Sequence, residues 1–140
     1  MELIIMSLTL TDQDKATLRT AAYGAVTLLA AADVTGSPHK AATAGSLALY
    51  SATGPVGHVL AEKKSGVGLD GKSVAGIADH VLPTLTSSMG LLKQQDPAEA
   101  GNFRNAVLVA VEAAARAHKG EPSPTAAEMT RKITAALDAA

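Results

Sequence analysis

The chain has 140 residues, of which 47% are hydrophobic, 18% charged and 2% aromatic, with a formal net charge of −1 and no cysteine. This length corresponds to one domain with its own core, and the near-neutral charge and scarcity of aromatic rings argue against a nucleic-acid or anionic-membrane partner. The absence of cysteine excludes disulfides and thiolate metal sites and fits a cytoplasmic protein.

Residues 1–10 are expected to form a flexible N-terminal arm ahead of a helical domain over residues 11–140. The arm begins MELIIMSL, which is too short to span a membrane and carries Glu2 where a secretion signal would be basic. We interpret it as a flexible tail or a short docking arm, with Met6 as an alternative natural start. No other apolar run reaches membrane-spanning length without a polar interruption, so no membrane segment is expected.

Two helices are expected first, separated by a glycine turn. Thr11 and Asp14 give the capping-box pattern that begins a helix, and apolar residues at three-to-four spacing then continue until Gly36 ends this central helix. Ser37-Pro38 starts the second helix as N-cap and first helical residue. This second helix is expected to run to about Ala52.

A short helix is expected after Gly54-Pro55, closing at Lys63-Lys64, and Val74 begins the next apolar pattern. Pro83 lies inside that pattern, so it either kinks one helix or starts a new one at Thr84.

The last two helices have the clearest start signals. Asp96-Pro97-Ala98-Glu99 supplies an N-cap, a proline at the first position and an acid at the third. This helix is expected to run to Ala117 and to stop at Gly120, and Ser123-Pro124 starts the last helix. Because no segment alternates strictly between apolar and polar residues, we predict an all-α, single-domain bundle of five to seven helices.

Gly66–Ser73, GVGLDGKS, fits the phosphate-binding pattern G-x-x-x-x-G-K-[ST] position for position. Its candidate nucleotide-binding residues are Gly66, Gly71, Lys72 and Ser73. The pattern works where a buried strand leads into the loop and a helix follows it. A helix is predicted from Ser73, but the residues before Gly66 are charged and predict no strand. We therefore favour a connecting loop, in which Ser73 or Asp70 caps the next helix, over a phosphate site.

No catalytic constellation can be recognised in the sequence, and no cofactor is predicted. The four histidines have no metal-binding spacing and are expected on helix surfaces: His39, His58, His80 and His118. Ser87 and Ser88 are expected on a helix surface or bonded to the preceding turn.

Two stretches, beginning at Val26 and Val109, repeat one pattern: an apolar helix with an alanine-rich end, a glycine turn, and Ser-Pro before a second helix. The repeat suggests two similar helical hairpins. The two turns carry the matching residues Ala31-Ala32-Asp33, Gly36 and Ser37-Pro38 in the first stretch, and Ala117, Gly120-Glu121 and Ser123-Pro124 in the second.

In these features the chain resembles the TerB-like tellurite-resistance domains, an all-helical family built of two similar halves. The resemblance implies acidic turn residues that bind a metal, and it makes Asp33, His118 and Glu121 the candidate ligands. The chain departs from the family where Val34-Thr35 precedes the first glycine and where His118-Lys119 replaces an acid. Asp33 and Glu121 supply few oxygen ligands for a hard cation, so ordinary capping and loop contacts are favoured.

Three function classes remain open. A non-enzymatic helical module that self-associates or binds a protein partner is favoured, and an exposed apolar stripe on one helix would support it. The second class is a TerB-like stress-response protein that binds a metal or small ligand. The third is nucleotide binding through Gly66–Ser73, which a strand before Gly66 would support.

Overall fold

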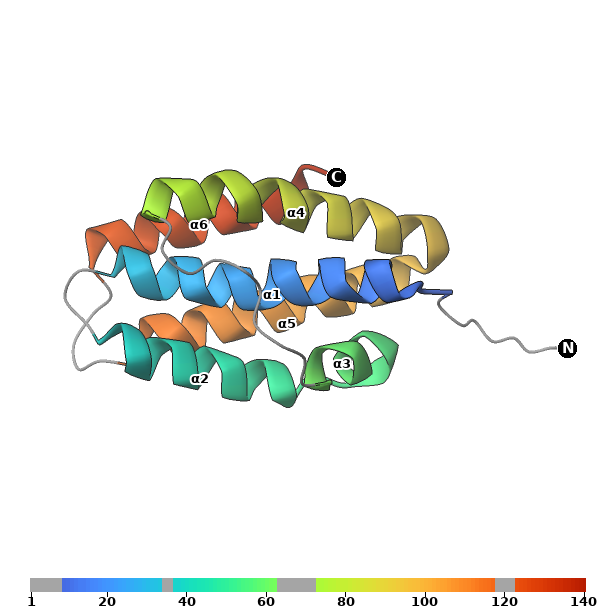
Figure 1. Ribbon diagram of the computed structural model, residues 1–140, viewed down its shortest axis with the longest axis horizontal. Coiled ribbons are helices and arrows are strands. Elements are labelled where there is room, and N and C mark those ends of the chain that lie inside the picture. The colour runs from blue at the N-terminus through green and yellow to red at the C-terminus, as the bar shows by residue number, and fades with distance from the viewer. Residues whose placement is uncertain (1–8, 34–36, 63–72, 118–122) are drawn as a thin grey trace, which may run out of the picture.

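The computed structural model describes residues 9–33, 37–62, 73–117 and 123–140, and within these ranges the chain forms six α-helices and no strand. The helices are α1 (Asp12–Ala32), α2 (Pro38–Tyr50), α3 (Gly54–Ala61), α4 (Val74–Gln95), α5 (Pro97–Ala115) and α6 (Pro124–Asp138). Their packing into one all-α bundle confirms the predicted fold class. Figure 1 shows α1 in the middle of the bundle, with α4 and α6 above it and α2 and α3 below.

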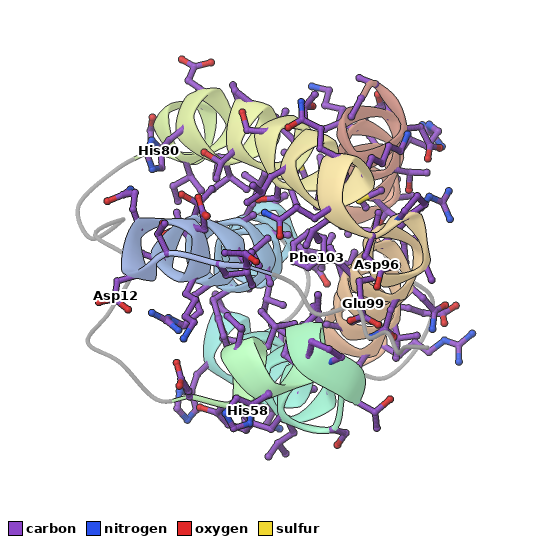
Figure 2. The ribbon with its side chains drawn as sticks, turned by 90° about the vertical axis from the view of Figure 1, so that its right-hand side faces the viewer. Asp12, His58, His80, Asp96, Glu99 and Phe103 are labelled. Carbon is purple, nitrogen blue, oxygen red and sulfur yellow. The ribbon has the colours of Figure 1, made fainter. Side chains whose placement is uncertain are left out.

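The centre of the bundle is formed by α1 and α5, because each of them contacts every other described helix. The buried face of α1 consists mostly of alanine, leucine and valine, and small side chains of this kind let neighbouring helices approach closely. Phe103 of α5 is completely buried and lies among the helices in the end-on view of Figure 2. The expectation that the first helix is central is therefore confirmed.

The helix starts agree with the sequence pattern. Thr11 and Asp14 form both hydrogen bonds of a capping box, each 3.0 Å long. The side chains of Ser37, Asp96 and Ser123 each accept a backbone N–H from the first turn of their helix. Because α2 contacts α1 and α6 contacts α5, the two predicted helical hairpins are both present.

Several helices end earlier than the apolar pattern predicts. α1 ends at Ala32 because Asp33 already has an extended backbone, and α2 ends at Tyr50 because the N–H groups of Ser51 and Ala52 bond three residues back, in a tighter turn. α5 ends at Ala115 in a similar tighter turn, because the N–H of Ala117 bonds the carbonyl of Ala114, three residues back. The expected stops at Gly36, Lys63-Lys64 and Gly120 lie outside the described residues.

α4 runs as one helix through Pro83, so the alternative of a new helix starting at Thr84 is wrong. Proline removes the N–H that would bond the carbonyl of Asp79, but Asp79 and Pro83 are both exposed, where water can serve that carbonyl. Val81 and Leu85, on either side of the proline, are completely buried. Packing of both halves against one core therefore keeps the helix continuous.

The last two residues assigned to the N-terminal arm lie against the bundle. The backbone N–H of Thr9 donates to Oε1 of Gln95 at 2.7 Å, and Leu10 packs against the core. Residues 1–8 lie outside the described residues. Among the helices that the structure describes, none is long and apolar enough to cross a membrane.

Candidate functional site

Ser73 is the one residue of the phosphate-loop pattern that the structure describes, and it caps α4. Its hydroxyl accepts the N–H of Gly76 at 3.0 Å, as the connecting-loop interpretation predicts. The described element before the loop is α3, a helix that ends at Ala61, and the described ranges contain no strand. Gly66, Gly71 and Lys72 lie outside the described residues, so nucleotide binding stays a prediction, without the preceding strand that would support it.

Asp33 is the described member of the predicted metal site. It is only 4% exposed and lies at the end of α1, where the hydroxyl of Thr125 donates to the carbonyl of Ala32 at 2.6 Å. His118 and Glu121 lie outside the described residues. Across the described residues, no group of three His, Cys, Asp or Glu side chains could hold a metal ion. The metal site implied by the TerB-like resemblance therefore stays a prediction.

The expectation of surface histidines is confirmed for His39, His58 and His80, which are all exposed. His58 on α3 and His80 on α4 lie on different sides of the bundle in Figure 2. The expectation for Ser88 is wrong, because this residue is completely buried and its hydroxyl has no hydrogen-bond partner among the described residues. Ser88 lies on the buried face of α4, and the residue type alone, a serine, did not indicate this burial.

The short helix α3 is held at its N-terminus by α5. Oε1 of Glu99 accepts the N–H of Val56 at 3.1 Å, and Nδ2 of Asn102 donates to the carbonyl of Thr53 at 2.7 Å. Gly54 has a φ of +79° and faces these same two side chains. Glu99 was expected to serve the start of its own helix, but its carboxylate reaches the orphan amides of a neighbouring one.

Two side chains of α1 hold the other end of α3. The Tyr23 hydroxyl donates to the carbonyl of Leu60 at 2.5 Å, and the Arg19 guanidinium lies 2.9 Å from Oε1 of Glu62. Burial raises the pKa of Tyr23 to about 12, helped by the nearby Tyr50 and opposed by Arg19. The two tyrosine rings are tilted, with centroids 6.0 Å apart. These contacts stabilise the helix directly before the glycine-rich loop.

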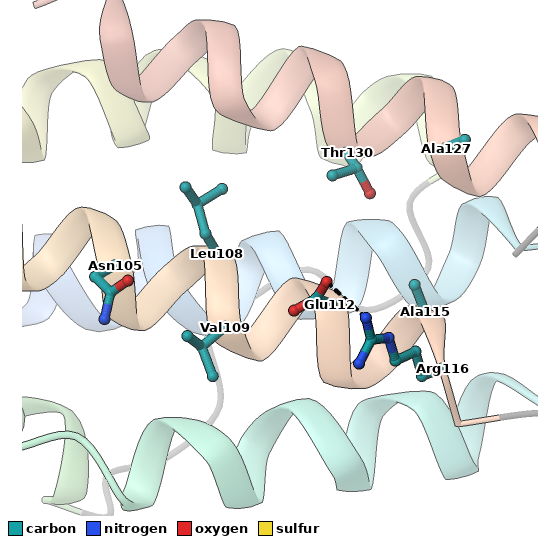
Figure 3. Close-up of a pocket in the computed structure, with 8 residues that line it drawn as sticks. All are labelled: Asn105, Leu108, Val109, Glu112, Ala115, Arg116, Ala127 and Thr130. Atoms are coloured by element: carbon teal, nitrogen blue, oxygen red, sulfur yellow. Dashed lines mark hydrogen bonds and ion pairs between the residues drawn. The ribbon is translucent and has the colours of Figure 1, made fainter.

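A groove of about 570 Å³ lies along the outer side of α5, between α5 and α6. Figure 3 shows Leu108 pointing toward α6 and Val109 pointing toward α2. At one end of the groove, Arg116 donates to Glu112 at 3.1 Å. The lining therefore combines an apolar middle with polar edges, and it consists of Asn105, Leu108, Val109, Glu112, Ala115, Arg116, Ala127 and Thr130.

Exposed apolar side chains also occur on α2 and α5, two helices that contact one another. Leu47 of α2 is 60% exposed and Val109 is 48% exposed, the two highest values among the large hydrophobic side chains of the described residues. A Cβ on Gly45 would lie 3.1 Å from the carbonyl oxygen of Ala110, so α2 and α5 are in close contact at this level. Leu47 is two residues from Gly45, Val109 is next to Ala110 in the sequence, and both side chains are exposed. We call these two residues the α2–α5 apolar pair.

Comparison with known proteins identifies no matching family model, curated protein or solved structure.

Proposed function

We propose that this chain is a non-enzymatic helical module that binds another protein chain through the outer face of α5 and its border with α2. The observation that carries the proposal is the exposure of the α2–α5 apolar pair, Leu47 and Val109. Exposed apolar side chains that gather on one face mark interaction sites more often than single scattered ones do.

The surroundings of the pair also support a binding face. Asn105, Glu112 and Arg116 are exposed along the same helix, and they give the apolar middle a polar margin. Protein interfaces commonly have this arrangement, in which a dry apolar centre is surrounded by residues that stay in contact with water. The described residues that line the groove include no histidine, and the carboxylate of Glu112 is paired with Arg116.

Site-specific photocrosslinking in cells that produce the chain naturally tests this proposal. A photoreactive side chain is placed at position 109, and the control places it at Ser87, which is exposed on α4. Protein adducts are expected at position 109 and not at position 87, and Leu47→Lys should reduce them. Identical adduct patterns at the two positions, or none at position 109, would refute the binding face.

A further inference from the structure

Leu47 and Val109, the α2–α5 apolar pair, lie at nearly the same level along the bundle. The close approach of Gly45 to the carbonyl oxygen of Ala110 aligns the two helices at that point, and α2 and α5 run in opposite directions in Figure 1. Leu47, two residues further along α2, is therefore displaced by about 3 Å in the same direction in which Val109, one residue back along α5, is displaced by about 1.5 Å. The two positions differ by about 2 Å or less along the bundle axis.

This common level makes the two positions self-complementary. A two-fold axis that crosses α2 and α5 at this level brings each of the two apolar side chains against its own counterpart in a second copy of the chain. Each helix is then antiparallel to its counterpart, with α2 facing α2 and α5 facing α5. One symmetry operation therefore covers both members of the pair, which are 60% and 48% exposed in the single chain.

The polar side chains of α5 fit the antiparallel arrangement. Asn105, Glu112 and Arg116 are exposed on either side of Val109. An axis midway between positions 108 and 109 places Asn105 opposite Glu112 of the second copy, since both lie about 5 Å from the axis along the helix. A carboxylate has two acceptor oxygens, so Glu112 can bind Arg116 of its own chain and still accept the amide of Asn105. The same axis places Arg116 opposite Gly101, which is exposed and carries no charge.

A parallel two-fold arrangement fits these charges less well. With the axis along the helices, Glu112 lies at the level of its own counterpart, and so does Arg116. Like charges that face each other across an interface oppose association. The charge pattern of α5 therefore favours the antiparallel dimer over the parallel one.

We propose that the partner of this face is a second copy of the same chain, bound in an antiparallel two-fold dimer centred on Leu47 and Val109. The proposal rests on the proposed function and deepens it by naming the partner. A small face that mixes apolar and polar side chains is typical of a reversible contact, so we expect a Kd of about 10–100 µM.

Sedimentation velocity of the purified full chain, recorded from about 5 to 500 µM, measures this association. The sedimentation coefficient should rise from that of a monomer toward that of a dimer. Val109→Lys should weaken association about tenfold or more, because two lysines then meet across the axis. Val74→Lys is the matched control and should leave association unchanged, because Val74 is also exposed but begins α4, which lies on the opposite side of α1 from α2 in Figure 1.

Position 105 tests the antiparallel register. Asn105→Lys places a cation opposite Glu112 of the second copy and should tighten the dimer about threefold, whereas Asn105→Glu should weaken it by a similar factor. Because the chain has no cysteine, single cysteines report the same geometry. Val109→Cys chains should be joined in pairs by a short bis-maleimide, and Val74→Cys chains should stay single.

Three results would overturn the proposal: a monomer at every concentration, a dimer that Val109→Lys weakens no more than Val74→Lys does, or a dimer that Asn105→Glu holds at least as tightly as Asn105→Lys. Photocrosslinking at position 109 separates this failure from failure of the proposed function. An adduct with twice the mass of the chain is expected. An adduct with a different protein keeps the proposed function and refutes the second copy, whereas the absence of any adduct contradicts the proposed function, whatever the purified chain does.

Discussion

Gly45 is the position at which the closest helix packing can be tested. A Cβ at this residue would lie 2.6 Å and 2.9 Å from the two methyl carbons of Val26 and 3.1 Å from the carbonyl oxygen of Ala110. Val26 is 1% exposed and Ala110 is completely buried, so neither has room to move away. Overpacking of this kind costs about 1–3 kcal/mol, and the gain of helix propensity from glycine to alanine offsets about 1 kcal/mol. Gly45→Ala should therefore destabilise the fold by up to about 2 kcal/mol.

Calorimetric melting measures this effect. For a chain of this length, 1 kcal/mol corresponds to roughly 3–4 °C in the midpoint, so Gly45→Ala should lower it by up to about 7 °C. Gly101→Ala is the control, because a Cβ at Gly101 meets nothing within 4 Å, and it should raise the midpoint by about 2–3 °C. In a double-mutant cycle, Val26→Ala should remove most of the Gly45→Ala penalty. A Gly45→Ala midpoint that rises as much as that of Gly101→Ala would refute the close approach of α1, α2 and α5.

Three further predictions concern side chains whose burial or contacts the sequence patterns did not reveal. Ser88→Ala removes a buried hydroxyl that has no hydrogen-bond partner in the described part of the chain, and it should stabilise the fold by about 1 kcal/mol in urea unfolding. A loss of stability would show that the hydroxyl does have a partner. Glu99→Ala leaves the N–H of Val56 without its acceptor and should lower the free energy of unfolding by about 1 kcal/mol. Amide hydrogen exchange in α3 should become faster. Glu99→Gln keeps an oxygen acceptor and should therefore retain part of this stability. The pKa of Tyr23 is raised to about 12 in the folded chain, compared with about 10 in the unfolded chain. The contribution of Tyr23 to the free energy of unfolding is therefore complete below pH 10 and is lost as the pH rises from 10 to 12. Tyr23→Phe should flatten this alkaline loss in melts recorded across that range, and an unchanged pH profile would contradict the assignment.

The helix starts could be predicted from the sequence because capping is local. At Thr11, Ser37, Asp96 and Ser123, the side chain and the N–H that it accepts lie within three residues of each other, so the pattern contains all the partners. The helix ends and Pro83 were less predictable. Whether a helix continues past a proline depends on what its two halves pack against, and that information lies in other helices.

The contacts around α3 and the groove could not be predicted, because they join distant residues. Glu99 and Val56 are 43 positions apart, and Tyr23 and Leu60 are 37 apart. In the sequence, Glu99 fits the capping pattern of its own helix, and only the fold shows that the start of α3 lies beside it. The α5–α6 groove depends in the same way on how two helices pack, for which a single helix pattern contains no signal.

The border between α2 and α5 separates residues that maintain the fold from residues available for binding. Gly45 and Ala110 join the two helices, so their substitution changes stability. Leu47 and Val109, on the same two helices, are exposed enough that a lysine at either position keeps its charge in water and should change the melting midpoint little. A variant such as Val109→Lys that keeps its stability but loses its partner therefore tests binding without a folding defect. If Val109→Lys unfolds the chain instead, Val109 belongs to the core, and the α2–α5 apolar pair is not a binding face.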